Sequence, residues 1–250
     1  MAPAEDALVT HYATYLATSA SGAGRYQVGP HLPVGSNRTE LAMHHEQEPH
    51  THFVVYTKSS LLEQTTPVAL EINDTVSIVT DLAFVDRDLD VAELGGEISW
   101  REPYDTSQVT FYSVYLSRSA AGADRSQIEA DVPFGVNRLL LAPETALESF
   151  THIVVYTKSP FTQQTTPTAL ALSDTVSSVE GVEFVDKDLD AEEVGGNVTW
   201  NATGDLALAT HYAVYFASNE TAWAERLRSG PDVPAAEQAE LFVPPDLQPP

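Results

Sequence analysis

The 250-residue chain contains no cysteine. This absence excludes disulfide bonds, thiolate zinc sites and cysteine nucleophiles together. No apolar run reaches the roughly 18 residues that a membrane-spanning helix needs, so direct membrane insertion is not expected. The first residues, MAPAEDALVTHY, lack the basic start and apolar stretch of a signal peptide.

Basic residues are scarce as well. Lys and Arg total 12 against 36 Asp and Glu, which gives a formal net charge of −24. A chain with this charge repels nucleic-acid phosphates and anionic lipid. We therefore expect no nucleic-acid partner and no membrane surface, whereas cations, proteins and glycans remain open as partners.

A repeat with a period of 100 residues is the strongest pattern that the sequence contains. The segment THFVVYTKSSLLEQTTPVALEINDT, which begins at Thr51, matches the segment from Thr151 at 16 of 25 positions without a gap. A second motif begins at Phe84 and again at Phe184. Because separate motifs keep one spacing, the repeat is secure. A unit of 100 residues has the size of an independent domain and is too long for a solenoid repeat.

Short β-rich runs separated by turn residues fill the middle copy of the repeat. These runs are 76–86, 95–100, 109–116, 136–142, 151–157 and 165–172, with a weaker one near 125–130. No stretch shows a sustained helical period of apolar residues. Seven short strands of this kind predict an all-β, two-sheet sandwich.

The repeat predicts three modules along the chain. Residues 1–76 form a partial sandwich without the first two strands, residues 77–176 a complete one, and residues 177–250 a partial one without the last two strands. Two explanations are open. Either the chain is a piece of a longer array, or the N-terminal part of one molecule completes the C-terminal part of another.

Trp100, Tyr112, Val114, Leu116 and Leu147 stand in this order along the expected strands of the middle copy, and in this order of residues the copy resembles a fibronectin type III module. The tryptophan of the family's second strand, the Tyr-x-Val-x-apolar run of its third strand and the leucine before its sixth strand have counterparts at Trp100, Tyr112, Val114, Leu116 and Leu147. The family's corner tyrosine falls on His152, and on His52 in the first copy. The resemblance implies tandem immunoglobulin-like sandwiches. The repeat motifs also resemble those of very large, many-copy proteins of algal protists.

Alternating aspartates form the main candidate binding motif. Asp86-Arg87-Asp88-Leu89-Asp90 recurs as Asp186-Lys187-Asp188-Leu189-Asp190. Closely spaced carboxylates suit Ca²⁺, although the glycine and glutamate of an EF-hand loop are missing. The type III topology implies that this loop shares a pole with other acids and with the neighbouring module, which calcium would bridge and stiffen. The candidate ligands are Asp86, Asp88, Asp90, Glu144, Glu148, Asp174, Asp186, Asp188 and Asp190. The alternative is a solvated acidic turn.

Histidines and asparagines form two further patterns. The histidines at positions 44, 45, 50 and 52 lie close together, but only His52 recurs in the middle copy, so we expect a drifted loop rather than a metal site. Five asparagines fit the N-glycosylation pattern and favour an extracellular or cell-surface glycoprotein, although the missing signal peptide disagrees. They are Asn37, Asn73, Asn197, Asn201 and Asn219.

The remaining aromatic and apolar residues divide into a core set and a loop set. Trp100, Trp200, Tyr112 and Tyr212 recur at fixed strand positions and are expected in the core, while Trp223 is expected to be a local anchor. Phe161, and Leu61 with Leu62 in the first copy, occupy the loop between the last two strands. They are candidate partner contacts, unless they fold back on the sandwich.

Together these patterns predict a non-catalytic structural or adhesive repeat region of a larger extracellular or surface protein, with calcium at the module junctions. The alternative is an accessory protein- or carbohydrate-binding module attached to a catalytic domain elsewhere in the parent chain. We do not expect an enzyme, because the acidic residues gather at module poles rather than in a cleft.

Overall fold

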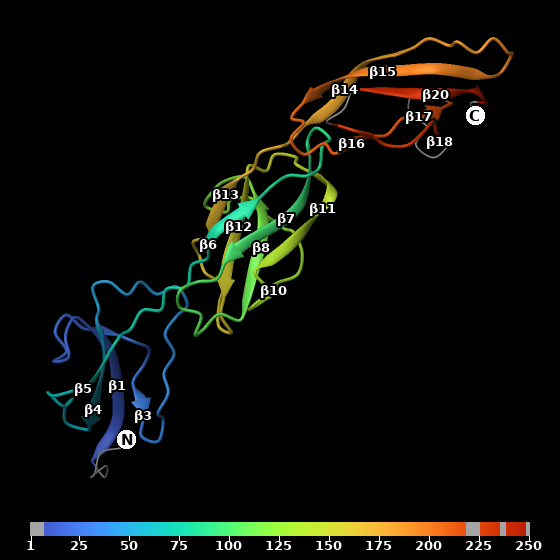
Figure 1. The fold of residues 1–250 in the computed structure, drawn as a ribbon. Coiled ribbons are helices and arrows are strands. Elements are labelled where there is room, and N and C mark those ends of the chain that lie inside the picture. Colours follow the sequence, from blue (N-terminus) through green and yellow to red (C-terminus); the bar gives the residue numbers. More distant parts are fainter. Residues whose placement is uncertain (1–7, 219–225, 236–238, 249–250) are drawn as a thin grey trace. The chain divides into compact units, whose positions relative to one another are not determined.

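The computed structural model describes residues 8–218, 226–235 and 239–248 and is all-β, which confirms the predicted fold class (Figure 1). Trp223 and Asn219 lie outside the described residues. The chain divides into two compact units, Met1–Val76 and Ser77–Pro250. Among the described residues, no helix has the length and apolar character needed to cross a membrane.

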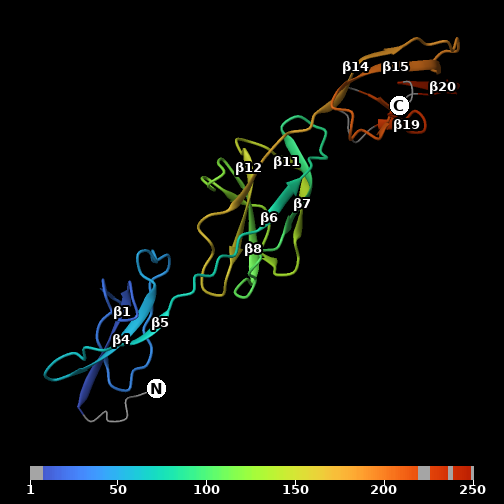
Figure 2. The same ribbon diagram turned by 60° about the vertical axis from the view of Figure 1, so that its left-hand side comes forward.

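The middle copy of the repeat is a sandwich of two antiparallel sheets. One sheet has the strand order β11-β7-β6, formed by β6 (Thr80–Phe84), β7 (Glu93–Arg101) and β11 (Arg138–Ala146). The other has the order β10-β8-β12-β13, with β9 also pairing with β8. Its strands are β8 (Phe111–Ser117), β9 (Ser126–Gln127), β10 (Val132–Pro133), β12 (His152–Lys158) and β13 (Thr168–Ala171). The two sheets lie face to face (Figure 2).

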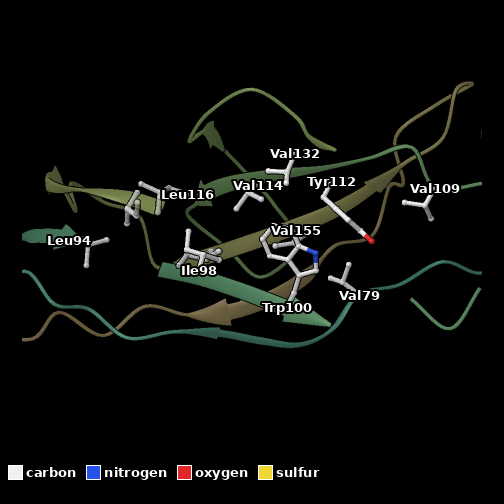
Figure 3. Close-up of a cluster of buried hydrophobic side chains, with 12 residues drawn as sticks. Val79, Leu94, Ile98, Trp100, Val109, Tyr112, Val114, Leu116, Val132 and Val155 are labelled. Atoms are coloured by element: carbon white, nitrogen blue, oxygen red, sulfur yellow. The ribbon is translucent and has the colours of Figure 1, made fainter. Parts of the chain in front are cut away.

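The core of this sandwich lies between the two sheets (Figure 3). Alternate residues of β7 and β8 point inward, as the period of two along a strand requires. Trp100 from β7 and Tyr112 from β8 are both buried, and their rings meet edge to face with centroids 5.3 Å apart. The prediction that these aromatic residues belong to the core is confirmed.

The N-terminal unit contains one sheet, and no second sheet occurs within its described residues. Its strand order is β2-β1-β4-β5, and β3 also pairs with β1. The strands are β1 (Val9–Ala17), β2 (Tyr26–Gln27), β3 (Leu32–Pro33), β4 (His52–Ser59) and β5 (Val68–Glu71). Residues 38–46, which align with β11, form no strand here. The physical reason is that β11 pairs with β7, and residues 1–76 contain no counterpart of β7.

The C-terminal copy repeats the first sheet with the order β14-β15-β20 and adds two short ribbons, β16 with β19 and β17 with β18. Trp200 packs against Tyr212 with the same 5.3 Å separation as in the middle copy. The strands are β14 (Ser177–Phe184), β15 (Val194–Gly204), β16 (His211–Tyr212), β17 (Tyr215–Ala217), β18 (Arg226–Arg228), β19 (Val233–Pro234) and β20 (Glu240–Leu247).

Candidate cation site

The aspartates of the loop between β6 and β7 turn the backbone of this loop through hydrogen bonds to it. The Asp86 carboxylate accepts a hydrogen bond from the backbone N–H of Asp88 at 3.2 Å, and Asp88 accepts one from the N–H of Asp90 at 3.2 Å. Each contact is an Asx-turn, in which a short side chain bonds to the backbone two residues later. The alternating aspartates therefore form two successive turns.

A glycine pair lets the neighbouring strands approach this loop. A Cβ atom on Gly95 would lie 2.8 Å from Cα of Pro143, and one on Gly96 would lie 2.5 Å from the Val85 carbonyl oxygen. Gly96 also has a φ of +149°, which L residues with side chains rarely adopt. The close approach brings Glu144, next to Pro143, against the aspartate loop. The pair recurs as Gly195-Gly196.

Four carboxylates meet where these segments converge. One carboxylate oxygen from each of Asp88, Asp90, Glu93 and Glu144 lies within 4.8 Å of the other three. Ligands bound at about 2.4 Å from one calcium ion can lie at most about 4.8 Å apart, so the cluster has the dimensions of a single-ion site. The backbone N–H of Glu144 donates to the Oδ2 atom of Asp88 at 2.6 Å, which fixes Glu144 beside the loop.

Like charges crowd this cluster. Burial, a hydrogen bond with Glu144 and the negative charges of Glu144, Asp88 and Asp90 raise the pKa of Glu93. The Oε2 atom of Glu93 is buried without a hydrogen-bond partner among the described residues. A proton or a cation would relieve this repulsion, since either one neutralises negative charge at the cluster.

The structure separates the predicted ligands into two groups. Asp88, Asp90 and Glu144 belong to the cluster, whereas Glu148 does not. The carboxylates of Asp86 and Asp174 accept hydrogen bonds from backbone N–H groups and do not belong to the cluster. Asp86, 3% exposed, accepts hydrogen bonds from Asp88, Gly95 and Thr175, and Asp174 accepts one from Ala92.

Glu93 was missed at the level of the sequence. The signal that marks it is its own recurrence, because Glu93 and Glu193 both stand two residues before the glycine pair. The second cluster consists of Asp188, Asp190 and Glu193, whose carboxylate oxygens also lie within 4.8 Å of one another. Asp186 again accepts from two backbone N–H groups, those of Asp188 and Gly195.

The four members of the first cluster all come from the middle copy. The same loop also contacts the segment that leads out of this copy, since Asp86 binds Thr175, Asp174 binds Ala92, and Ser177 N–H donates to the Leu89 carbonyl. These bonds, and not a shared carboxylate ligand, connect the loop to residues 174–177.

The other candidate residues are placed as follows. Leu61, Leu62 and Phe161 are exposed and do not fold back on the sheets. No acid or histidine group of metal-binding geometry among the described residues includes His44, His45, His50 or His52. The asparagine side chains differ: residues 37, 73 and 201 are exposed, whereas the Asn197 amide donates to Glu240 within the β15–β20 sheet.

No protein-family model matches the chain, and no curated protein matches it in sequence. The interpretation of the site therefore depends on its geometry and on the repeat.

Proposed function

We propose that this chain is a non-catalytic structural or adhesive repeat region of a larger extracellular or cell-surface protein, built from fibronectin type III-like modules that bind calcium at their acidic clusters. The strand orders β11-β7-β6 and β10-β8-β12-β13 support the module type.

One observation carries the calcium proposal. Carboxylate oxygens of four residues converge within 4.8 Å in the middle copy, and three residues at equivalent positions do so in the C-terminal copy. Calcium takes six to eight oxygen ligands, so backbone carbonyls or water would complete the shell around these carboxylates. Burial, the hydrogen bond with Glu144 and like-charge repulsion raise the pKa of Glu93, and the bound ion would offset the repulsion.

Calcium at this cluster would also stiffen the exit from the module. The loop that holds Asp88 and Asp90 bonds to the backbone of residues 175 and 177. An ion that fixes the loop therefore reduces the freedom of that segment. This is the mechanical role that we propose for the site in an array.

A calcium titration of the whole chain tests this proposal. We expect calorimetric binding and a rise in unfolding temperature, since ligand at 100 times its Kd adds about 2.7 kcal/mol to the stability of the folded state. The double variant Asp88→Asn/Asp90→Asn should lose the part of both effects that comes from the middle copy and keep the part that comes from the second cluster. The matched control is Asp124→Asn, an exposed aspartate of the same module at a left-handed φ that Asn tolerates. Calcium effects that are absent at millimolar concentration, or that are unchanged in the double variant, contradict the proposal.

The proposed compartment has its own test. Asn37, Asn73 and Asn201 are exposed acceptors, so secretion from a eukaryotic host should yield N-glycans at these residues. Removal of the glycans with an amidase should lower the apparent mass. A protein secreted without any glycan would argue against the glycoprotein assignment.

A second candidate is an accessory module that binds a protein partner. It is favoured by one observation, the exposure of Leu61 and Phe161 on the same loop of two copies. Screening the chain against immobilised extracellular proteins tests it. Binding that is lost in Phe161→Ser and kept in Leu140→Ser, an exposed residue of β11, would support this candidate over a purely spacing role.

A further inference from the structure

In the first copy of the repeat, an arginine stacks on two tyrosine rings and pairs with a glutamate. The guanidinium carbon of Arg25 lies 4.5 Å from the ring centre of Tyr15 and 4.6 Å from that of Tyr56. Glu63 uses both of its carboxylate oxygens at this stack. Its Oε1 atom lies 2.7 Å from Nη1 of Arg25, and its Oε2 atom accepts a hydrogen bond from the Tyr15 hydroxyl at 2.7 Å. The first copy therefore supplies its own anion to these donors.

The middle copy keeps the stack but lacks the carboxylate. Arg125 lies 4.7 Å from the ring centre of Tyr115 and 4.3 Å from that of Tyr156. The residue aligned with Glu63 is Gln163, a neutral amide that cannot form the ion pair. Within the part of the chain that the structure describes, Arg125 forms no ion pair with any other acid. The guanidinium is exposed to solvent.

Tyr115 connects Arg125 with a second donor that lacks an acceptor. The ring of Tyr115 contacts the guanidinium, and its hydroxyl reaches Oε1 of Gln163 only at 3.5 Å. The Nε2 atom of Gln163 is buried and has no hydrogen-bond partner among the described residues. A buried donor of this kind favours any ligand that brings an acceptor. The site thus combines a positive charge with neutral donors and lacks the carboxylate that the first copy provides.

We propose that Arg125, Tyr115 and Gln163 bind the carboxylate of an aspartate or glutamate side chain from a protein partner, in the place that Glu63 fills in the first copy. Arginine suits this ligand because its planar fork forms charge-assisted hydrogen bonds with both oxygens of a carboxylate. Phe161, which is 69% exposed, precedes Gln163 by two residues in the same loop. An apolar side chain of the partner can contact Phe161, which favours a protein over a free anion.

This inference rests on the second candidate function, a module that binds a protein partner, and it gives the chemical class of the group that is recognised. The repeat supplies two reciprocal variants to test it. Gln163→Glu should fill the site of the middle copy from within, and Glu63→Gln should open the site of the first copy. Each substitution introduces the residue that the other copy already contains, so both variants are expected to fold.

Nuclear magnetic resonance of the full chain reads the two copies separately through the side-chain Nε–H signals of Arg25 and Arg125. The probe is the amide of N-acetylglutamic acid, which carries a single carboxylate, and the amide of N-acetylglutamine is its neutral control. One charge-assisted contact predicts a Kd on the order of 10 mM, so the titration extends to about 100 mM. The carboxylate probe should shift the Arg125 signal and leave the Arg25 signal in place. The neutral probe should shift neither signal.

The variants should then redistribute these shifts. Gln163→Glu should abolish the shift at Arg125, and Glu63→Gln should add a shift at Arg25. Tyr115→Phe removes one donor and keeps the ring under the guanidinium, so it should weaken binding about fivefold.

Four results would overturn the proposal. The first is no shift at Arg125 at the highest probe concentration, and the second is a shift that persists in Gln163→Glu. The third is a shift with glucuronate but not with the glutamic acid probe, which would assign the site to an acidic glycan. The fourth is a protein partner that needs Phe161 but binds Gln163→Glu as tightly as the wild type. This last result would contradict carboxylate recognition and leave the second candidate function intact.

Discussion

Replacing Asp86 by alanine should destabilise the middle module much more than the same change at Asp186. Asp86 is 3% exposed, and its carboxylate accepts backbone hydrogen bonds from Asp88 at 3.2 Å, Gly95 at 2.9 Å and Thr175 at 2.9 Å. Each buried N–H left without a partner costs about 1–3 kcal/mol. Some relaxation and hydration will reduce the sum, so we expect a loss of about 3 kcal/mol.

Asp186 is the matched control that the repeat itself provides. Its carboxylate accepts only two backbone bonds, from Asp188 and Gly195, and the residue is exposed. Water can replace the lost carboxylate there, so Asp186→Ala should cost less than about 1 kcal/mol. An Asp86→Asn variant refines the test, since its single carbonyl oxygen keeps two acceptor sites and we expect a smaller loss than for alanine.

The assay must separate the modules, because a multi-module chain need not unfold in one step. Hydrogen exchange at increasing urea, followed on peptides from residues 77–176 and 177–218, reports the two copies independently. Equal losses for Asp86→Ala and Asp186→Ala would refute the reasoning. They would mean that water already reaches the amides around Asp86.

Two further predictions concern Gly96 and Glu93 of strand β7, which follows this loop. Gly96→Ala should lower the unfolding temperature more than Gly135→Ala in a thermal scan. Both glycines have a positive φ, but only at Gly96 would the new Cβ meet the Val85 carbonyl, at 2.5 Å. Without calcium, stability should fall as the pH rises above 4.5 through the raised pKa of Glu93, since the folded state binds the proton more tightly than the unfolded state. Glu93→Gln should flatten this part of the profile of urea midpoint against pH. The same substitution should weaken calcium binding relative to the wild type, as measured by calorimetry. A pH profile that is unchanged in Glu93→Gln would contradict the like-charge argument.

The sequence by itself determined the fold class and the core. Alternating apolar residues and turn residues are local signals, and a strict repeat shows each one two or three times. Trp100 and Tyr112 were identified as core residues in this way, because residues that recur at strand positions in each copy must face a common interior.

Only the tertiary structure decided which acids form the cluster. Asp86 and Asp88 belong to one motif and are chemically identical, yet Asp86 bonds to backbone groups of β7 and residue 175 while Asp88 faces Glu144. Glu93 joined the cluster because the glycine pair draws β7 towards β11. These contacts span up to 89 residues of sequence, so no local pattern encodes them.

The same reason explains the segment at residues 38–46. It aligns with strand β11 but forms no strand, because a β-strand exists only where a partner strand accepts its hydrogen bonds. The pattern of apolar and turn residues therefore determines where strands are able to form in this protein. The presence or absence of a distant pairing partner decided which of them do.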